Sequence, residues 1–362
     1  MNALFDSAAY NLTLGKINPL LREIPDDDDK KLVDEFWRKA ARYFGTIYGI
    51  DKAIENGQTK KEDACGPGIE KTYEILHEGE QLNKSLKDGG LIKKIKMLFR
   101  ECGIPVGIKS EIVKHAFLKP SGYAGDFGII EIVYDNKIIS NGVGYCADKL
   151  FLMDDYARAV RSRKEKMKEI LAAFLNSAPS RSIEILNIAC GSCRELKEMF
   201  HENAFDESKK ISFTLVDHDQ AALDFSREAL KKSPPHVEYH FMRHNAYEFV
   251  KNPDAFRDIL SGKDLVYTIG LADYIPDQPL TSLIAFFYSI LNPGGKLIIA
   301  HKDSKNFSPL AADWWCDWTF HLRNESETVS LVDSAGIKNC TIDVIRESET
   351  NIIFFMIVEK KI

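Results

Sequence analysis

Two short segments of this chain carry the residue types that can hold a nucleoside. The segment 184–195 is an apolar run that breaks at a single glycine, Gly191, and then continues in a helical pattern. The segment 213–217 is a second apolar run, and it ends in the carboxylate of Asp217, 26 positions after the glycine. In a strand–turn–helix–strand unit the glycine lets the backbone approach a ligand, and the acid accepts hydrogen bonds from ribose hydroxyls. The two segments therefore predict a nucleoside-binding half-fold.

The elements around these segments alternate between strands and helices, which is the signature of a parallel sheet. We expect helices at 220–232 and 280–291 and a helical stretch over 308–336. Strands are expected at 184–189, 212–217, 237–242, 264–269 and 296–301, with a turn at Asn292-Pro-Gly-Gly295 before the fifth. Two final apolar runs, 341–345 and 352–359, predict an antiparallel hairpin at the sheet edge. The predicted fold class is α/β, a Rossmann-like sheet of five parallel strands plus a C-terminal hairpin.

The first part of the chain is expected to be mainly helical. Four acids, Asp26–Asp29, suit a helix N-terminus, where the macrodipole favours negative charge. Further helices are expected at 68–87, 91–101, 106–117, 128–134 and 154–176, with Gly103-Ile-Pro105 ending the one at 91–101. Ser177-Ala-Pro-Ser-Arg181 closes the last of them. We therefore expect a helical domain over 1–180 and the sheet domain over 181–362.

Composition and charge limit the functions that this chain can have. Its 362 residues, 44% hydrophobic and 28% charged, are enough for one large domain or two ordinary domains with their own cores. No apolar run approaches the roughly 20 residues that span a bilayer. The first residues lack the pattern of a signal peptide, so a cytoplasmic location is expected. The net charge of −6 argues against a general nucleic-acid binder.

Seven cysteines are scattered along the chain, at positions 65, 102, 146, 190, 193, 316 and 340. The odd number and the expected compartment favour free thiols over a disulfide framework. Cys190 and Cys193 form a C-x-x-C pair, which could be redox-active or half of a metal site. No second C-x-x-C or H-x-x-H completes a zinc set, so we expect no metal and interpret the pair as variation within the glycine loop.

The architecture and these motifs resemble the class I S-adenosylmethionine-dependent methyltransferases over residues 180–362. Asn187-Ile-Ala-Cys-Gly191 is similar to the family's first glycine loop, although Ala189 and Cys193 stand where two of its usual three glycines would be. Leu291-Asn-Pro-Gly-Gly295 is similar to the family's turn before the fifth strand. The resemblance implies S-adenosylmethionine as the cofactor and a ribose-binding role for Asp217.

The same resemblance implies further cofactor-binding positions. His218 follows where adenine-lining residues usually lie, and Asn245-Ala246 matches the position that holds the adenine amino edge. The segment from Thr268 to Tyr274 matches the loop that borders the methionine and the transferred methyl. The cofactor-binding residues implied on this side are Ala189, Cys190, Gly191, Asp217, His218, Asn245, Ala246, Thr268, Gly270 and Leu271.

A narrower similarity, over about residues 120–335, is to a bacterial subgroup described as extracellular-factor, or 3-hydroxypalmitic acid methyl ester biosynthesis, methyltransferases. It rests on Gly122-Tyr-Ala-Gly-Asp126, Ala159-Val-Arg-Ser-Arg163, Asn187–Gly191, Gly270-Leu-Ala-Asp-Tyr274 and the segment from Asp317-Trp318 to Arg323. The similarity implies that Tyr123 and Arg163 bind the methionine carboxylate or close the site, and the alternative for Arg163 is a solvated helix face. Residues 1–115 match no family, and the helical domain is expected to form a cap that holds the substrate.

Methyl transfer needs the acceptor aligned with the methyl group and water excluded. A carboxylate acceptor is already ionised at neutral pH, whereas an amine or a hydroxyl usually needs a base. The candidate catalytic residues are Asp273, Tyr123 and His301, the last at the end of the fifth strand, where open α/β sheets bind ligands. Asp317 and His321 are further candidates near the expected site.

Three tryptophans, Trp314, Trp315 and Trp318, fall within five residues. They either pack a helix against the sheet or form an apolar wall for an acyl or aromatic acceptor, with Arg323 pairing the carboxylate of that acceptor. The substrate-binding candidates are Tyr274, Trp315, Trp318, His321 and Arg323.

The predicted function is S-adenosylmethionine-dependent methyl transfer to a small-molecule acceptor, with a 3-hydroxy fatty acid-like carboxylate giving a methyl ester as the leading option. The alternative is an O- or N-methyltransferase of a specialised-metabolite pathway that acts on a compact polar or aromatic substrate. A nicotinamide-dependent dehydrogenase would need G-x-G-x-x-G after the first strand, and only Gly191 is present. A cofactor-binding scaffold is the non-enzyme alternative, and the oligomeric state stays open, with a homodimer among the options.

Overall fold

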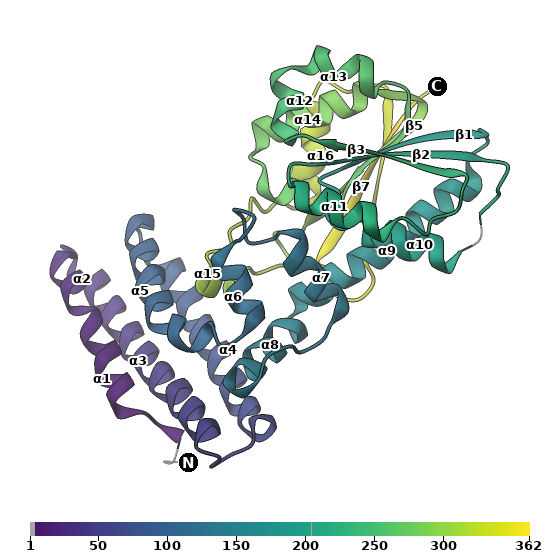
Figure 1. Cartoon of the computed structure of the whole chain (residues 1–362). Helices are drawn as coiled ribbons and strands as arrows, with labels where there is room; N and C mark the ends of the chain where they lie inside the picture. The colour runs from purple at the N-terminus through teal and green to yellow at the C-terminus, as the bar shows by residue number, and fades with distance from the viewer. Residues whose placement is uncertain (1–3, 204) are drawn as a thin grey trace. The chain divides into compact units, whose positions relative to one another are not determined.

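The protein, described here by a computed structural model over residues 4–203 and 205–362, divides into two compact units (Figure 1). The first unit runs to Asp154 and also includes Pro309–Thr319. The second unit consists of Asp155–Ser308 and Phe320–Ile362. The division along the chain therefore falls at residue 154, earlier than the boundary expected near residue 180.

Helix α9 (Asp155–Ser177) accounts for the earlier boundary. We expected this helix from the sequence and placed it in the N-terminal domain, because it continues the helical pattern of that part of the chain. In the structure α9 packs against α10 (Arg194–Glu202) and strand β7 (Ile353–Lys360), both of which belong to the second unit. A helix is assigned to a unit by what it packs against, and sequence periodicity does not contain that information.

The first unit is built of helices. They are α1 (Ser7–Lys16), α2 (Asn18–Glu23), α3 (Asp27–Glu55), α4 (Lys61–Ser85), α5 (Gly89–Gly107), α6 (Glu111–Leu118), α7 (Phe127–Asp135), α8 (Gly142–Met153) and α15 (Leu310–Cys316). Helix α3 begins at the four acids, where Asp26 Oδ1 accepts a hydrogen bond from Asp29 N (2.9 Å). The expected break at Gly103-Ile-Pro105 is wrong, because α5 continues to Gly107 and Pro105 in its last turn removes only one backbone hydrogen bond. Within the described residues, no helix is both long and apolar enough to cross a membrane.

Helix α15 follows strand β5 (Leu291–Lys302) along the chain but packs among the N-terminal helices α4, α5 and α6. Trp314 is fully buried, with its ring centroid 5.3 Å from Phe36 and 5.2 Å from Phe99. The Trp315 ring lies 5.6 Å from Phe99. These two tryptophans therefore pack a helix against other helices, and not against the sheet as one of the two interpretations had it.

A glycine of α4 makes room for the Trp314 ring, and its replacement gives a test of this packing. A Cβ at Gly79 would lie 2.6 Å from Cζ2 and 2.7 Å from Cε2 of Trp314. Gly→Ala in a helix usually stabilises a protein by roughly 0.5–1 kcal/mol, whereas overpacking a core costs about 1–3 kcal/mol. We therefore expect Gly79→Ala to lower the free energy of unfolding, measured by chemical denaturation of the full chain.

The matched control for this substitution is Gly15→Ala in α1, because nothing lies within 4 Å of a Cβ added there. We expect Gly15→Ala to raise the free energy of unfolding slightly or to leave it unchanged. If Gly79→Ala were stabilising like the control, the Trp314 ring would not occupy the position described.

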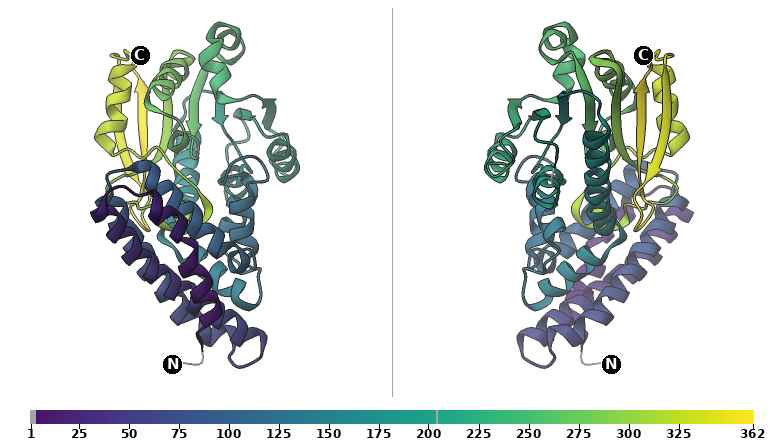
Figure 2. Two further views of the ribbon diagram at one scale, coloured as in Figure 1. Left: turned by 90° about the vertical axis from the view of Figure 1, so that its left-hand side faces the viewer. Right: turned by 90° about the vertical axis from the view of Figure 1, so that its right-hand side faces the viewer.

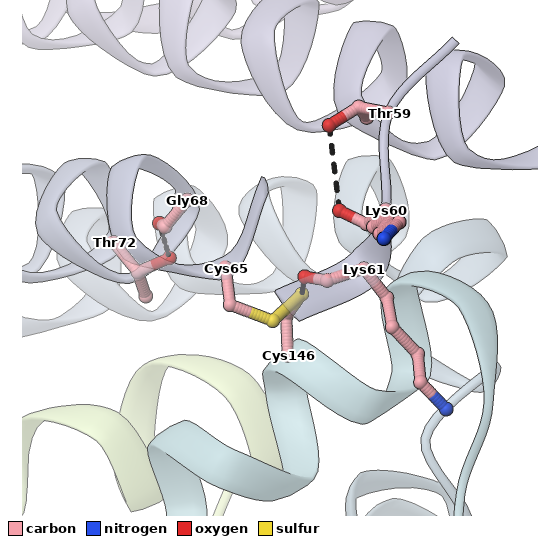
Figure 3. Close-up of a disulfide and its surroundings, with 7 residues drawn as sticks. All are labelled: Thr59, Lys60, Lys61, Cys65, Gly68, Thr72 and Cys146. Atoms are coloured by element: carbon pink, nitrogen blue, oxygen red, sulfur yellow. Dashed lines mark hydrogen bonds between the residues drawn. A yellow bond between two sulfur atoms is a disulfide. The ribbon is translucent and has the colours of Figure 1, made fainter. Parts of the chain in front are cut away.

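The cysteines differ from the expectation in one pair. Cys65 of α4 and Cys146 of α8 form a disulfide across a sequence separation of 81 residues (Figure 3). The expectation of free thiols is therefore wrong for these two, because only the packing of α4 against α8 brings them together. The other cysteines, namely Cys102, Cys190, Cys193, Cys316 and Cys340, are free. In the part of the chain that the structure describes, no cluster of His, Cys, Asp or Glu side chains is arranged to hold a metal ion.

The second unit contains a seven-stranded sheet with the order β3-β2-β1-β4-β5-β7-β6. Its strands are β1 (Ser182–Ile188), β2 (Lys210–Asp217), β3 (Val237–Arg243), β4 (Lys263–Thr268), β5 (Leu291–Lys302), β6 (Cys340–Arg346) and β7 (Ile353–Lys360). Strands β1 to β5 pair in parallel, and β7 pairs antiparallel with both β5 and β6. Figure 2 shows β6 and β7 in yellow at one edge of the sheet. The α/β class with a mixed seven-stranded sheet is confirmed.

Helices cover both faces of this sheet. Besides α9 and α10 they are α11 (Gln220–Ala229), α12 (Ala246–Lys251), α13 (Pro253–Leu260), α14 (Asp277–Ser289), α16 (Glu325–Ser334) and the 3-10 turn η2 (Ala272–Tyr274). Figure 1 shows α9, α10 and α11 on one face and α12, α13, α14 and α16 on the other. The two-sided cover explains why the central strands are buried along nearly their whole length, as in other parallel sheets.

The segment Asn292-Pro-Gly-Gly295 lies inside β5 and does not precede it. Leu291 pairs with Lys263, and the register then shifts so that Lys296 pairs with Leu265. A Cβ at Gly295 would lie 2.9 Å from the Lys263 carbonyl oxygen, so only glycine allows this close approach. The expected turn therefore lies within the strand as a bulge-like irregularity, in which the four residues 292–295 lie opposite the single residue 264.

Candidate functional site

The carboxyl ends of β1, β2 and β4 meet where the strand order reverses. Strand β1 pairs with β2 on one side and with β4 on the other. Open α/β sheets bind ligands in the crevice at such a point. Residues 189–193, Asp217 and Gly270 lie at these three strand ends, so the structure brings predicted cofactor-binding residues to one edge of the sheet.

The loop after β1 has the backbone of a glycine-rich turn although it holds one glycine. Ala189, Gly191 and Cys193 have φ angles of +53°, +55° and +48°, and the left-handed region costs a side-chain-bearing residue about 1 kcal/mol. The loop is held by Cys190 N, which donates to Val216 O (3.0 Å). It is also held by Ser226 Oγ, which donates to Gly191 O (2.6 Å). Contacts with β2 and α11 therefore offset the strain and keep the turn that the two missing glycines would have formed.

Asp217 ties this loop to the end of β2. Its buried carboxylate accepts Gly191 N at Oδ2 (2.9 Å) and Asp219 N at Oδ1 (3.0 Å). An ionised carboxylate offers about four acceptor positions, so these two bonds leave capacity for ligand hydroxyls. His218 is exposed beside it, and its interaction with Asp217 raises the pKa of the imidazole.

Asn245 and Ala246 follow β3, the next strand outward from β2. Asn245 Oδ1 accepts from Tyr247 N (2.9 Å), and Asn245 N donates to Glu248 Oε1 (3.0 Å). Asn245 and Glu248 thus form a capping box that begins α12. Strands β2 and β3 pair up to the level of Asp217. The two predicted adenine-binding residues therefore lie at the same edge of the sheet as Asp217, on a segment fixed by its helix cap.

Arg163, Thr268 and Gly270 lie on the other side of the loop. A Cβ at Gly270 would lie 3.5 Å from Arg163 Nη1, an ordinary van der Waals contact, so the guanidinium of this α9 residue lies close to the end of β4. Arg163 is 5% exposed, which argues against a solvated helix face. The buried Thr268 Oγ1 has no hydrogen-bond partner among the described residues. Because buried hydroxyls are rarely left unsatisfied, this atom can donate a hydrogen bond to, or accept one from, water or a polar ligand group. Leu271 is half-buried after Gly270.

A buried carboxyl that follows the loop after β1 was not among the residues expected from the sequence. Glu195, in the first turn of α10, is 3% exposed. Its Oε1 accepts from Asn187 Nδ2 (3.2 Å) and from Tyr267 OH (3.0 Å), and Asn187 Nδ2 also lies 2.8 Å from that hydroxyl. Burial raises the pKa of Glu195 to about 7. The one sequence signal for this residue was that an acid follows the loop. No spacing rule predicts that Tyr267 of β4 lies beside it.

Asp273 is buried in an ion pair beside the loop after β4. Lys302 N donates to its Oδ1 (2.9 Å), and Lys302 Nζ pairs with its Oδ2. Burial alone would raise the pKa of Asp273, but Lys302 and His301 hold it far below its usual range. Such a carboxylate does not take up a proton near neutral pH, so these contacts favour a structural role for Asp273 over the expected catalytic one.

Lys302, the last residue of β5, was also missed by the sequence analysis. Its ammonium lies 4.5 Å from the ring centroid of Phe320, 5.1 Å from that of Tyr156 and 5.7 Å from that of Tyr274. Burial lowers the pKa of Lys302, and Asp273 opposes this effect. Cation–π contacts and one ion pair replace the hydration that the ammonium loses. Tyr274, expected to bind substrate, is therefore one wall of this aromatic cage.

The two histidines of the prediction have different environments. His301 is fully buried, with its ring centroid 5.8 Å from that of Phe354. Its Nδ1 lies 2.9 Å from Asp273 Oδ1 without the alignment of a hydrogen bond. His321 is exposed, and its backbone N donates to Asp273 O (2.7 Å). Neither position gives an imidazole that is both accessible and oriented by a carboxylate.

Arg323 holds the loop after β4 in place. Its Nη1 donates to the carbonyl oxygens of Ala272 (3.3 Å) and His321 (3.2 Å), and its Nη2 donates to that of Ile275 (2.6 Å). Its Nε and Nη2 contact Asp277 Oδ1 at 2.7 and 2.6 Å. These four hydrogen bonds and the ion pair engage all three guanidinium nitrogens. They favour a structural role for Arg323 over the expected pairing with an acceptor carboxylate.

Four predicted site residues belong to the first unit, namely Tyr123, Trp315, Asp317 and Trp318. Tyr123 is half-buried in the loop before α7, whose cap Asp126 accepts from Ile129 N (2.9 Å). Trp315 packs against the helical core, and Trp318 is buried two residues after α15. The other predicted residues, including Arg163, all belong to the second unit.

Comparison with known proteins gives a family match over most of the chain. The sequence matches the model of a family described as "Putative methyltransferase" over residues 106–348. It is also similar to the Uncharacterized protein YnbC of Escherichia coli (strain K12), with 22% identity over 233 residues, or 59% of this chain and 37% of that protein. The chain thus spans little more than a third of the length of this curated relative.

Solved structures give more distant likenesses. A protein from Bordetella parapertussis, described as a possible exported protein, has a TM-score of 0.48 and 17% identity, covering 66% of this chain and 80% of its own. Magnesium protoporphyrin IX methyltransferase from Synechocystis PCC 6803, solved with bound S-adenosylmethionine, has a TM-score of 0.41 and 9% identity, covering 57% of this chain and 83% of its own. At this distance the site has to be interpreted from its own geometry.

Proposed function

The chain belongs to this methyltransferase family, and we propose that its second unit binds S-adenosylmethionine and methylates a small-molecule acceptor. When bound, the cofactor supplies a methyl group on a sulfonium, which is already activated for an in-line displacement. The residues of the chain then have to hold the adenosyl and methionine parts, align the acceptor and exclude water.

The buried Asp217 carboxylate, hydrogen-bonded to Gly191 N, is the observation that carries this proposal. Its remaining lone pairs suit the two ribose hydroxyls of an adenosyl group at the end of β2. A nicotinamide dinucleotide would also bring a pyrophosphate, which needs glycines so that the backbone can approach it. The side chains of Ala189 and Cys193 occupy those positions, so the loop suits a nucleoside without phosphates.

The methionine end of the cofactor is assigned to the other side of the loop. A buried guanidinium forms strong charge-assisted hydrogen bonds with a carboxylate, and Arg163 is such a group beside Gly270. The unsatisfied Thr268 Oγ1 offers a further polar contact. We assign Asn245, Ala246 and His218 to the adenine and the outer ribose edge.

For the acceptor we favour a carboxylate, which gives a methyl ester. An amine or a hydroxyl usually needs a base. The three candidate bases of the second unit are poorly suited. Asp273 stays ionised in its ion pair, His301 is fully buried, and the exposed His321 has no side-chain hydrogen bond to a carboxylate among the described residues. A carboxylate needs no base, and a 3-hydroxy fatty acid-like molecule remains the proposed example. The helical unit is proposed to be the substrate-holding part of the chain, with Tyr123, Trp315 and Trp318 as its substrate-binding residues.

Binding and transfer can be tested separately. Isothermal titration with S-adenosylmethionine should show binding, and its absence would contradict the proposal. Transfer of a labelled methyl group should then be compared between 3-hydroxy fatty acids and the alcohols and amines of the same chain length. A product that releases methanol on mild alkaline treatment is an ester and supports the carboxylate. A base-stable product would establish the O- or N-methylating alternative.

A further inference from the structure

Glu195 is a buried carboxyl to which the structure gives no cationic partner. Its Oε1 accepts hydrogen bonds from Asn187 and Tyr267, which are neutral groups. Among the described residues, no lysine, arginine or histidine lies within 4.0 Å of its carboxylate oxygens as an ion pair. Three residues further along α10, Glu198 pairs with Lys164, Lys168 and Arg194. A buried ionised carboxylate without such a partner is costly, so this position has to be explained.

Besides Asn187 of β1, the groups that face Glu195 come from three elements. Tyr267 extends from β4, Arg163 acts from α9 at longer range, and Cys190 and Cys193 lie in the preceding loop. Burial raises the pKa of Tyr267 well above its usual value. The hydrogen bond with Cys193 raises the pKa of the Cys190 thiol well above its usual value. With the pKa of Glu195 raised to about 7, this carboxyl is the group of the cluster whose charge changes near neutral pH.

The position of Glu195 relates it to the cofactor site. Its hydrogen bond to Asn187 attaches it to the end of β1, and the loop 189–193 lies between these two residues in sequence. Arg163 lies beside Gly270 at the neighbouring strand end. A buried carboxyl and a buried guanidinium near one loop complement the two opposite charges of an amino-acid group.

We propose that Glu195 receives the α-ammonium of the methionine part of S-adenosylmethionine and loses its proton as the cofactor binds. This inference rests on the proposed function and extends it to the charge balance of cofactor binding. The balance is simple: the carboxyl O–H bond breaks, the proton passes to solvent, and the carboxylate accepts an N–H hydrogen bond from the ammonium. The ammonium is preferred to the sulfonium as the partner, because a sulfonium has no N–H or O–H to donate.

If Glu195 loses its proton on binding, the affinity for the cofactor should depend on pH in a defined direction. Below a pH of about 7 Glu195 is protonated, and a ligand that requires the carboxylate has to displace that proton. The affinity for S-adenosylhomocysteine, which has the same ammonium, should therefore rise about tenfold per pH unit up to neutral pH and then level off. The affinity for 5′-methylthioadenosine, which lacks the amino-acid group, should not show this rise.

The experiment is isothermal titration of the full chain at about pH 6 in two buffers of different ionisation enthalpy, which counts the protons released on binding. We expect release with S-adenosylmethionine and S-adenosylhomocysteine and none with 5′-methylthioadenosine. Because all three ligands contain the adenosine part, any contribution of His218 appears with each of them and can be subtracted. Equal release with all three would overturn the inference. Release with S-adenosylmethionine alone would also overturn it, because it would point to the sulfonium.

The variant Glu195→Gln keeps the acceptor oxygen for Asn187 and Tyr267 but cannot ionise. It should bind S-adenosylhomocysteine at least about tenfold more weakly at pH 8 and release no proton, while its affinity for 5′-methylthioadenosine stays unchanged. The matched control is Glu202→Gln on the same helix, where Glu202 is half-exposed and pairs with Lys168; it should behave as the wild type. If the unsubstituted protein bound none of the three ligands, this result would contradict the proposed cofactor site. Unchanged proton release by Glu195→Gln would contradict only the role of Glu195.

Discussion

Replacing Asp217 with alanine is expected to weaken the binding of S-adenosylmethionine by a factor of about 100 or more. The substitution removes the acceptor of Gly191 N, which holds the loop after β1, and the acceptor proposed for the ribose hydroxyls. Hydrogen bonds to charged groups contribute about 1.5–3 kcal/mol each, and 1.4 kcal/mol corresponds to a factor of ten in affinity. Two such bonds therefore account for the expected loss, which isothermal titration can measure directly.

The control for Asp217→Ala is Asp224→Ala, which removes an exposed carboxylate from α11, the helix that follows β2. Within the described residues, the side-chain hydrogen bonds of Asp224 go to Gln220 and Arg227 of its own helix, so we expect wild-type affinity. The variant Asp217→Asn keeps one acceptor oxygen and should lie between the two. If Asp217→Ala bound S-adenosylmethionine as tightly as the wild type, the assignment of the site to this edge of the sheet would be wrong.

The parts of the site that could be predicted from the sequence are those that local patterns determine. An apolar run followed by Gly191, and another ending in Asp217, each specify a strand end within a few residues. The parallel sheet then places such ends together without any need for side-chain detail. The same logic placed Asn245 and Gly270 correctly at strand ends, because each follows a strand of the same sheet.

The parts that could not be predicted depend on which side chains meet across distant elements. Glu195 and Tyr267 are 72 positions apart, and nothing in either segment shows that the carboxyl and the hydroxyl face each other. Arg323 matched a motif, but the pattern does not show that its donors are used on the loop after β4. Likewise the tryptophan cluster showed an apolar helix, and only the packing of α15 among α4, α5 and α6 shows which core it enters.

Glycine and proline signals also had different meanings in different contexts. Asn292-Pro-Gly-Gly295 has the composition of a turn, and the structure uses it as a bulge-like irregularity that shifts the register of β5. Gly103 and Pro105 have the composition of a helix end, yet α5 continues through them. A Cβ at Gly103 would lie 2.5 Å from the Trp315 ring, so close packing accounts for this glycine. In both segments tertiary contacts decide what the local signal means.

Replacing Lys302 with methionine is expected to destabilise the protein by about 3–5 kcal/mol, because it removes the ammonium paired with the buried Asp273 carboxylate and leaves the His301 imidazole as the remaining partner of that carboxylate. Methionine fills a similar volume among Tyr156, Tyr274 and Phe320, so the loss comes mainly from the broken ion pair and less from a cavity. The free energy of unfolding, measured by chemical denaturation, tests this expectation. An exposed pair gives the reference: Lys71→Met, opposite Glu74, should change the stability by at most about 1 kcal/mol.

The double variant Lys302→Met/Asp273→Asn separates the charge from the shape of this site. The neutral amide keeps an oxygen that can accept from the backbone N of residue 302, so it removes the buried charge and preserves the bond that holds the loop. We therefore expect the double variant to recover most of the stability that Lys302→Met alone loses, as for other buried ion pairs replaced by neutral groups. If the double variant were as unstable as the single one, the aromatic cage would depend on the ammonium itself, through its contacts with Phe320, Tyr156 and Tyr274, and not on neutralising Asp273.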